Sequence, residues 1–289
     1  MTTAGYSINL GLPNIPETND EALFYELVKV YNALRLLSGG IDTSSVTGTV
    51  AGTASGLVVT ANIGASTALV VAKELIVNST LNATKIENFS VTVNLSVVGI
   101  NGRDSATAIP ANSDIAIYAI YNDTTNSYGL LAQVCTGTVP TSTYTGSYSL
   151  GAAKYSILVS ILIAGGTTFS NSFKQIGRQV SIITSTVLGA ATPTTSYQAV
   201  SLVSYVPYAT ISVTGQVGIF GASVAGQTLT QVAMDTTGIG QAHVSSALAG
   251  EYNSLGFSLP ISIPQTIYRA TSAVIAGQAI TIYICSYTF

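Results

Sequence analysis

Apolar residues recur at alternating spacings of four and three along one stretch near the start of the chain. This seam consists of Leu23, Leu27, Val30, Leu34 and Leu37. The spacing is that of the a and d positions of a coiled coil, and it predicts an amphipathic helix over residues 17–38. Thr18 and Glu21 have the spacing of an N-terminal capping box, and Gly39 and Gly40 stand where glycine commonly ends a helix.

We expect this seam to join copies of the chain. Leu27 and Leu34 at a positions, with Val30 at a d position, favour a trimer over a dimer. Residues 39–56 are rich in Gly, Ser and Thr, so they predict a flexible linker or a slender β-shaft that orders when identical chains wind together. Such a linker leaves the apolar stripe without a local partner. Packing of the helix on the chain's own β-structure remains the alternative.

The first 16 residues predict an extended arm, punctuated by Gly5, Gly11 and Pro13. No partner strand lies nearby in the sequence, so we expect the arm to dock on another protein, and a disordered tail is the alternative. Its candidate anchoring residues are Tyr6, Ile8, Leu10, Leu12 and Ile15. The stretch lacks a positive region and a long apolar run, so we expect no secretory signal.

The rest of the chain alternates short apolar runs with turn residues, a pattern typical of antiparallel sandwiches. Residues 57–183 predict one β-sandwich domain, in which Asn122 to Asn126 form the turn of a hairpin. Residues 184–201 are rich in Thr, Ala and Pro and predict a second linker. Residues 202–289 predict a C-terminal β-domain. The expected fold is therefore mainly β, with a coiled-coil-like helix before two antiparallel sandwich domains.

Charge is scarce in this chain. Charged residues make up 7% and hydrophobic residues 47%, against a usual charged share of roughly 25%. Such a chain either enters a membrane or buries much of its surface against copies of itself or other partners. The longest apolar run, residues 155–164, is too short to span a bilayer as a helix. The net charge of −3, without a basic cluster, argues against nucleic-acid binding.

The search for catalytic chemistry finds little. His243 is the single histidine, and no cysteine or acidic residue stands at metal-ligand spacing from it. The carboxylates of the β-rich part occur singly in turns, and no phosphate-binding or dinucleotide loop is present. Cys135 and Cys285 lie in strand-like runs and are expected to be free thiols, with a disulfide as the alternative. We expect no enzyme, no catalytic residue, no metal and no cofactor.

The region Gly99–Val180 has a recognisable order of motifs, in which an Asn-Gly-x-Asp turn leads to a Tyr-rich strand, a polar hairpin and a Phe-x-Gln strand. The motif positions are Asn101, Gly102, Asp104, Ala111, Asn112, Tyr118, Tyr121, Pro140, Tyr144, Gly146, Leu150, Gly151, Phe173, Gln175, Gly177 and Arg178. This region resembles a β-domain of the fibre, spike and collar proteins of tailed bacteriophages. The opening of the chain is similar to their N-terminal anchor and helix.

The resemblance implies a homotrimer whose N-terminus grips the capsid, portal or tail and whose C-terminal domain faces the host. It brings no catalytic residues. The expected function is that of a structural virion protein, a head fibre or tail fibre that is made in the host cytoplasm and is located in the virion. Neither nucleic acid nor membrane is an expected partner.

Two other functions stay open at this point. The first is a dedicated receptor-binding protein that recognises a host-surface glycan. Its candidate contacts are Tyr252, Tyr268, Tyr283 and Tyr287. Core or trimer contacts are the alternative for these tyrosines, and the commoner role of tyrosines on a strand face. The second is an outer-membrane β-barrel, because residues 281–289 alternate in polarity and end in Phe. The absence of a signal sequence and the amphipathic N-terminal helix disfavour the second.

Overall fold

A computed structural model describes residues 54–78, 83–146, 155–221 and 226–289. The chain divides into two units, Met1–Gly48 and Thr49–Phe289, and all structural statements concern the second. The predicted arm, the helix with its seam and most of the predicted 39–56 linker lie outside the described residues.

The described residues are mainly β, as the sequence predicted, and no helix occurs among them. Val, Ile, Thr and Tyr dominate the strands, because branched and aromatic side chains suit a pleated surface. The strands are β1 (Ala54–Ser55), β2 (Val58–Ala61), β3 (Thr67–Asn78), β4 (Ala83–Asn94), β5 (Gly102–Arg103), β6 (Ile109–Asn122), β7 (Ser127–Val134), β8 (Tyr155–Gly166), β9 (Thr168–Phe169), β10 (Phe173–Ile176), β11 (Gln179–Ala191), β12 (Gln198–Ser201), β13 (Ser212–Phe220), β14 (Thr228–Ala233), β15 (Ala242–Ser246), β16 (Asn253–Pro260), β17 (Thr266–Thr271) and β18 (Ala279–Thr288).

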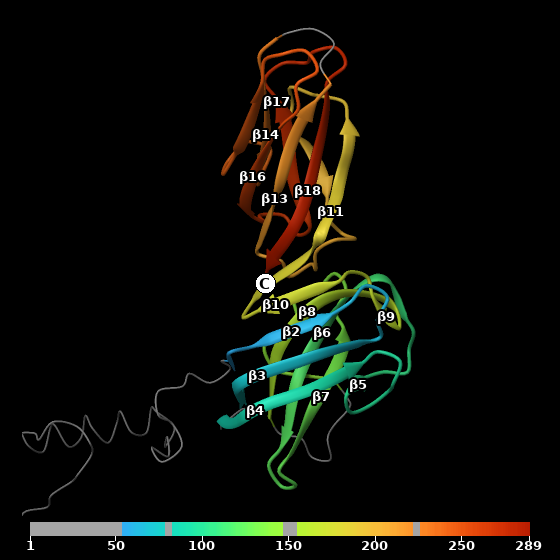
Figure 1. Ribbon diagram of the computed structural model, residues 1–289. Coiled ribbons are helices and arrows are strands. Elements are labelled where there is room, and N and C mark those ends of the chain that lie inside the picture. Colours follow the sequence, from blue (N-terminus) through green and yellow to red (C-terminus); the bar gives the residue numbers. More distant parts are fainter. Residues whose placement is uncertain (1–53, 79–82, 147–154, 222–225) are drawn as a thin grey trace, which may run out of the picture. The chain divides into compact units, whose positions relative to one another are not determined.

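The first group of strands forms two ladders that share a core. One ladder runs β10-β2-β3-β4 and the other runs β8-β6-β7-β5, and a single residue pair, Asn78 with Ser156, connects β3 to β8. On β3, residues 68, 70 and 72 are buried while 67, 69, 71 and 73 are exposed, so one face of the ladder is exposed to solvent. β6 is buried on both faces from Ser113 to Ile120. The predicted hairpin is confirmed, because β6 and β7 pair up to Asn122 and Ser127 (Figure 1).

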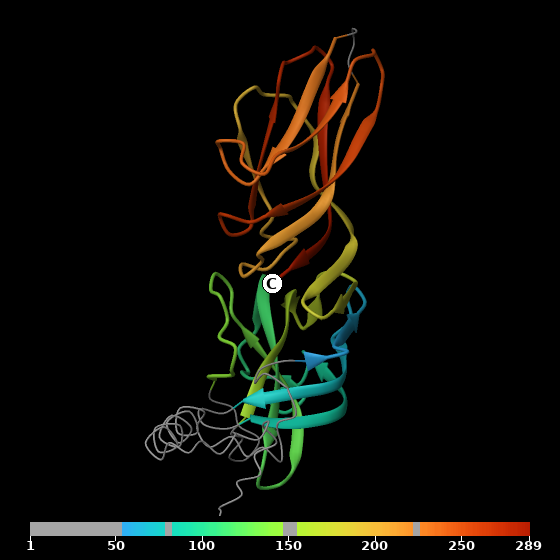
Figure 2. The same cartoon turned by 90° about the vertical axis from the view of Figure 1, so that its left-hand side faces the viewer.

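The second group of strands contains two sheets (Figures 1 and 2). The strands β16-β13-β18-β11 continue the 14-stranded sheet of the first group through β10, and β12-β17-β14-β15 form a separate four-stranded sheet. Each sheet contributes apolar side chains to the buried core. These side chains are Val213, Val217, Ile280, Ile282 and Ile284 from the first sheet, and Val200, Val232, Val244 and Ile267 from the second. Buried positions alternate with less buried ones along the first part of β13 and of β14, which fits sheets that are covered more on one face than on the other.

β11 belongs to both groups of strands and corrects the predicted 184–201 linker. Its first residues, Gln179–Ile182, pair with β10, and β18 pairs along its other edge as far as Ala191. Residues 184–191 are therefore strand. Their Thr- and Ala-rich composition gave no local sign of this, because the ladder partner comes from the last ten residues of the chain. Residues 192–197 separate β11 from β12.

Buried hydrogen bonds join the two groups beside β11. The Asp114 carboxylate on β6 is 1% exposed and accepts a hydrogen bond from the backbone N–H of Tyr208 at 2.8 Å. The hydroxyl of Tyr287 on β18 donates to the carbonyl of Ile161 on β8 at 2.8 Å. Burial raises the pKa of Asp114 and of Tyr287. These contacts bind Tyr208 and Tyr287, both from the second group, to the first group of strands.

The two cysteines are free thiols, as predicted. Cys135 is buried, and its Sγ atom lies 3.5 Å from the Asp114 carbonyl oxygen. Burial raises the pKa of Cys135 to about 12, so the thiol stays protonated at neutral pH and is a poor nucleophile.

Gln175 ties the two ladders of the first group together. Its side chain is fully buried on β10. Its amide donates to the carbonyls of Val159, at 2.7 Å, and Gly177, at 2.6 Å, and its Oε1 atom accepts from the hydroxyl of Ser160, at 2.5 Å. The bonds to Val159 and Ser160 are buried, whereas Gly177 is exposed. Loss of a buried partner leaves the remaining group desolvated without a hydrogen bond, which is costly.

Ser160→Ala is therefore expected to lower the free energy of unfolding by about 1–3 kcal/mol, since it leaves the Gln175 Oε1 atom unpaired in the core. Urea denaturation at pH 7 measures the change. Ser181→Ala is the matched control on exposed β11 surface and is expected to shift stability by less than about 0.5 kcal/mol. Equal effects of the two substitutions would contradict this role of Gln175.

A second prediction concerns Asp114 and the dependence of stability on pH. Its ordinary pKa is 3.8 and burial raises the folded value. Between those two values the folded state holds more protons than the unfolded state, so the free energy of unfolding falls as pH rises. Asp114→Asn removes the group that titrates. Relative to wild type, the free energy of unfolding of the variant is therefore expected to increase as pH rises, as measured by urea denaturation from pH 3.5 to 8. Parallel pH profiles for the two proteins would refute it.

Candidate functional site

The Asn101-Gly102-Arg103-Asp104 segment has a backbone that its residue types explain. Asn101 adopts a φ of 59°, a left-handed conformation that Asn tolerates better than most residues. Its backbone N–H donates to the Leu130 carbonyl at 2.8 Å, and its Oδ1 atom accepts from the Leu130 N–H at 3.0 Å. A Cβ atom on Gly102 would lie 2.3 Å from the Val97 carbonyl oxygen, so glycine is required there.

This segment then pairs in parallel with β7. Gly102 lies opposite Leu131 and Arg103 opposite Ala132, and the Asp104 N–H donates to the Ala132 carbonyl at 2.9 Å. The pairing fixes the backbone from which the Arg103 and Asp104 side chains extend. It also brings Gln133, the next residue of β7, beside Asp104.

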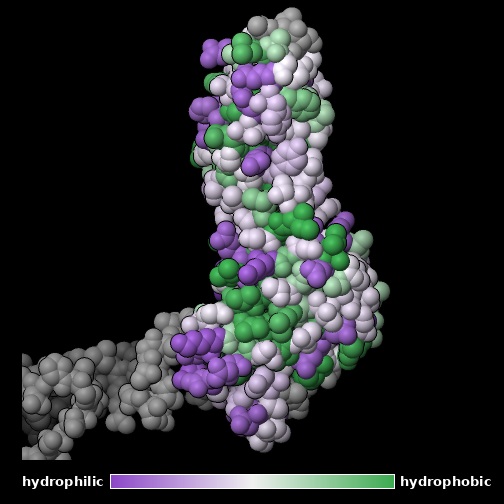
Figure 3. All heavy atoms as spheres, in the orientation of Figure 1, coloured by the Kyte–Doolittle hydropathy of each residue, from purple (hydrophilic) through white to green (hydrophobic). Residues whose placement is uncertain are grey.

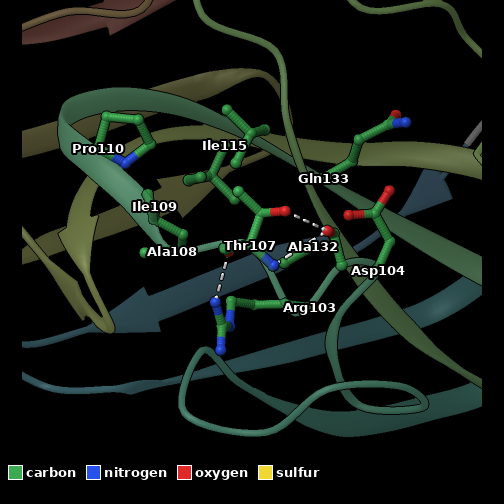
Figure 4. Close-up of a pocket in the computed structure, with 11 residues that line it drawn as sticks. Arg103, Asp104, Thr107, Ala108, Ile109, Pro110, Ile115, Ala132 and Gln133 are labelled. Carbon is green, nitrogen blue, oxygen red and sulfur yellow. Dashed lines mark hydrogen bonds between the residues drawn. The ribbon is translucent and has the colours of Figure 1, made fainter.

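A pocket of about 370 Å³ lies between this segment, the start of β6 and the end of β7 (Figure 4). Ile109 and Ile115 are buried in its wall, whereas Thr107 and Pro110 are exposed at its rim. The full lining is Arg103, Asp104, Ser105, Thr107, Ala108, Ile109, Pro110, Ile115, Ala132, Gln133 and Val134. A mostly apolar pocket with a few polar groups is the common form of small-molecule sites.

The polar groups of the pocket are held by a few hydrogen bonds. Arg103 donates through Nη1 to the Thr107 carbonyl at 2.8 Å, and its buried Nε atom has no partner in the described protein. The Asp104 carboxylate accepts from the Tyr144 hydroxyl at 3.4 Å and from the Gln133 side chain. Burial raises the pKa of Asp104, and these hydrogen bonds oppose the rise. The pocket therefore offers one cation, one carboxylate and one amide.

The motif positions from the sequence meet at this pocket in part. Asn101 and Gly102 shape the backbone, Asp104 lines the pocket, and Tyr144 holds Asp104. Tyr118 packs edge-on against the Tyr144 ring, with the ring centroids 5.5 Å apart. Sequence reasoning missed Arg103 and Gln133 as lining residues. Arg103 stands inside the motif, but Gln133 arrives only through the parallel pairing of β5 with β7.

The four candidate receptor tyrosines do not form one site. Tyr287 is 3% exposed and donates its hydroxyl to Ile161, so its assignment as a surface contact is wrong. Tyr268 lies on β17, in the other sheet from Tyr283 on β18. Tyr252 is 54% exposed and its ring lies 6.1 Å from that of Phe220.

The other chemistry-bearing residues stabilise loops or face solvent. His243 is exposed on β15. The Asp235 carboxylate accepts from the N–H of Thr237 at 2.8 Å, and the Glu251 carboxylate accepts from the N–H of Ala247 at 3.0 Å. Within the residues that the structure describes, no three His, Cys, Asp or Glu side chains gather as a metal site. Among the same residues, no helix has the length and apolarity needed to cross a membrane.

A second feature is the apolar outer face of the β10-β2-β3-β4 ladder. Ile176, Val58 and Val71 lie directly opposite one another across three strands, and Ile176 is 64% exposed. The neighbouring row contains Leu69, which is 42% exposed and lies opposite Thr60. Side chains that face each other in this way are within contact distance. Figure 3 shows hydrophobic surface gathered over this part of the molecule.

The outer face also has a hollow and a polar border. The hollow, of about 420 Å³, is lined in part by Leu69, Thr60 and Thr92. Lys73 and Lys174 are exposed at the borders of the apolar rows, and Lys174 makes no ion pair in the part of the chain that the structure describes. An apolar centre inside a polar rim is the usual composition of a protein–protein contact.

Comparison with known proteins shows no family. No family model matches the sequence, and no curated protein sequence matches it. A search of solved structures finds a similarity to the structure of infectious bursal disease virus, Gx strain. That match has 12% sequence identity and a TM-score of 0.23, and it covers 83% of this chain and 69% of the other chain. At that TM-score the similarity carries no argument about fold or function.

Proposed function

We propose that this chain is a structural virion protein that forms a homotrimeric fibre or spike. The observation that carries the proposal is the apolar outer face of the exposed Leu69, Val71 and Ile176 and the half-buried Val58, on a chain with few charges. An aliphatic surface of this kind, if left in water, favours association. Because every copy carries the same face, copies of the chain are the partners always present.

The charge content supports self-association over a solitary soluble monomer. The whole chain has 9 Lys and Arg and 12 Asp and Glu residues. Two of them, Lys85 and Glu87, pair with each other at 2.6 Å on the exposed β4 strand. So few charges give weak electrostatic repulsion between copies, which leaves the contact of apolar faces unopposed.

The N-terminal residues complete the proposal on sequence grounds. The seam of Leu23, Leu27, Val30, Leu34 and Leu37 sets the trimer register, and the arm of residues 1–16 docks on the capsid, portal or tail. A short seam is marginal alone. Two weak contacts that hold the same three chains reinforce each other, because the second forms at high effective concentration.

The oligomeric state of the full chain tests the proposal. Sedimentation velocity at micromolar concentration is expected to give three times the 29.6 kDa chain mass. Val71→Asp with Ile176→Asp is expected to weaken the assembly at least tenfold, since each carboxylate would be buried without a partner. Leu27→Asp with Leu34→Asp is expected to weaken it similarly.

Ser254→Asp with Ser258→Asp is the matched control, because it adds the same two charges at exposed strand positions of β16. It is expected to leave the trimer intact. A monomeric wild-type chain would overturn the proposal. So would a trimer that neither the Val71 and Ile176 pair of substitutions nor the Leu27 and Leu34 pair weakens.

A further inference from the structure

We propose that the pocket between Arg103, Asp104 and Gln133 binds a neutral hexose unit of a polysaccharide. This assignment does not depend on the self-association described above, because it rests on the β5–β7 pocket alone. It also differs from the tyrosine contacts that the sequence suggested, since none of those tyrosines lines the pocket.

The balance of charge in the pocket selects a neutral ligand. Arg103 and Asp104 are the only charged residues in the lining, and their formal charges cancel. An anionic ligand would meet the Asp104 carboxylate, and a cationic ligand would meet the Arg103 guanidinium. A like-charge contact in a partly desolvated site is unfavourable. A polyhydroxylated molecule avoids both contacts.

The unused hydrogen-bonding capacity matches sugar hydroxyls, which both donate and accept. Arg103 has five N–H donors. Within the described residues one of them is used, toward Thr107, and the buried Nε–H has no partner there. The Asp104 carboxylate has about four acceptor positions, and Tyr144 and Gln133 occupy two. A buried donor without a partner is costly and needs an explanation. Figure 4 shows the Arg103 and Asp104 side chains extending in different directions, so two hydroxyls of one ring, one that accepts from Arg103 and one that donates to Asp104, would use this capacity.

The apolar part of the lining suits the C–H face of a pyranose ring. Ile109, Ile115 and Ala132 form the wall, and Pro110 and Val134 are exposed at the rim. Figure 4 shows Asp104 and Gln133 at one end of the pocket and Ile109 and Pro110 at the other. The volume of about 370 Å³ lies near the lower end of the range for ligand sites, which fits one ring and not a longer oligosaccharide.

The site is preorganised by backbone as much as by side chains. Asn101 in its left-handed conformation and the close approach of Gly102 to Val97 set the course of the segment. The Asp104 N–H bond to Ala132 then fixes the carboxylate relative to Gln133. A ligand therefore meets polar groups that already hold their positions, and this lowers the entropy cost of binding.

Saturation-transfer-difference NMR on the full chain tests the assignment with D-glucose, D-galactose, D-mannose and D-glucuronate as probes. At least one neutral hexose is expected to bind with a dissociation constant in the millimolar range and to be preferred over glucuronate. Asp104→Ala and Gln133→Ala are each expected to weaken binding at least tenfold. Glu87→Gln, an exposed change on β4, is the control and is expected to leave binding unchanged.

Thermal unfolding of each variant separates loss of the site from loss of the fold. Gln133→Ala removes a half-buried side chain at the end of β7, so its unfolding temperature is expected to stay close to that of wild type. This variant therefore still tests the site if Asp104→Ala does not fold. The assignment would be overturned if no neutral hexose bound even at a concentration 50 times a millimolar dissociation constant. It would also be overturned if glucuronate bound more tightly than every neutral hexose, or if a folded Gln133→Ala variant bound as well as wild type.

Discussion

The pairing of β11 with β18 is the constraint on which the described fold depends. β11 enters from the first group of strands, where Gln179–Ile182 pair with β10, and it continues as an outer strand of the second group. β18 ends at Thr288, so the last residues of the chain lie against the middle of the sequence. The Tyr287 hydroxyl and the Arg178 guanidinium, which lies 5.5 Å from the Phe289 ring centroid, add to this contact. β11 therefore joins the two groups of strands into one continuous sheet.

The same pairing explains which parts of the fold the sequence predicted. Strand-forming composition and turn residues predicted a mainly β chain and the β6–β7 hairpin, because both are properties of neighbouring residues. The β11 strand was taken for a linker, since Thr and Ala residues form a strand only when a partner supplies the ladder, and that partner lies about a hundred residues away. Tyr287 was taken for a surface residue for the same reason.

The candidate site was predictable to a similar extent. Asn101, Gly102 and Asp104 stood out in the sequence only as positions of the resemblance, which has an Asn-Gly-x-Asp turn before its Tyr-rich strand. Arg103 and Gln133 did not, because a parallel bridge of two residues has no sequence signature. Their placement depends on the close backbone contact of Gly102 with Val97, which excludes a side chain. The motif therefore marks a backbone arrangement, and the pocket is a consequence of it.

The low charge content of the chain bears on both the pocket and the outer face of the β10-β2-β3-β4 ladder. The buried Gln175 side chain is hydrogen-bonded to β8, and one carboxylate oxygen of the buried Asp114 accepts from the Tyr208 N–H, so both side chains contribute to the fold. Within the described residues, the Arg103 Nε atom has no hydrogen-bond partner, and the Ile176 and Leu69 side chains are exposed. In a chain with so few charged residues, we propose that the Arg103 and Asp104 side chains and the exposed apolar rows recognise partners outside the fold. The apolar rows then suit another protein surface, and the mixed polar pocket suits a small hydroxylated ligand.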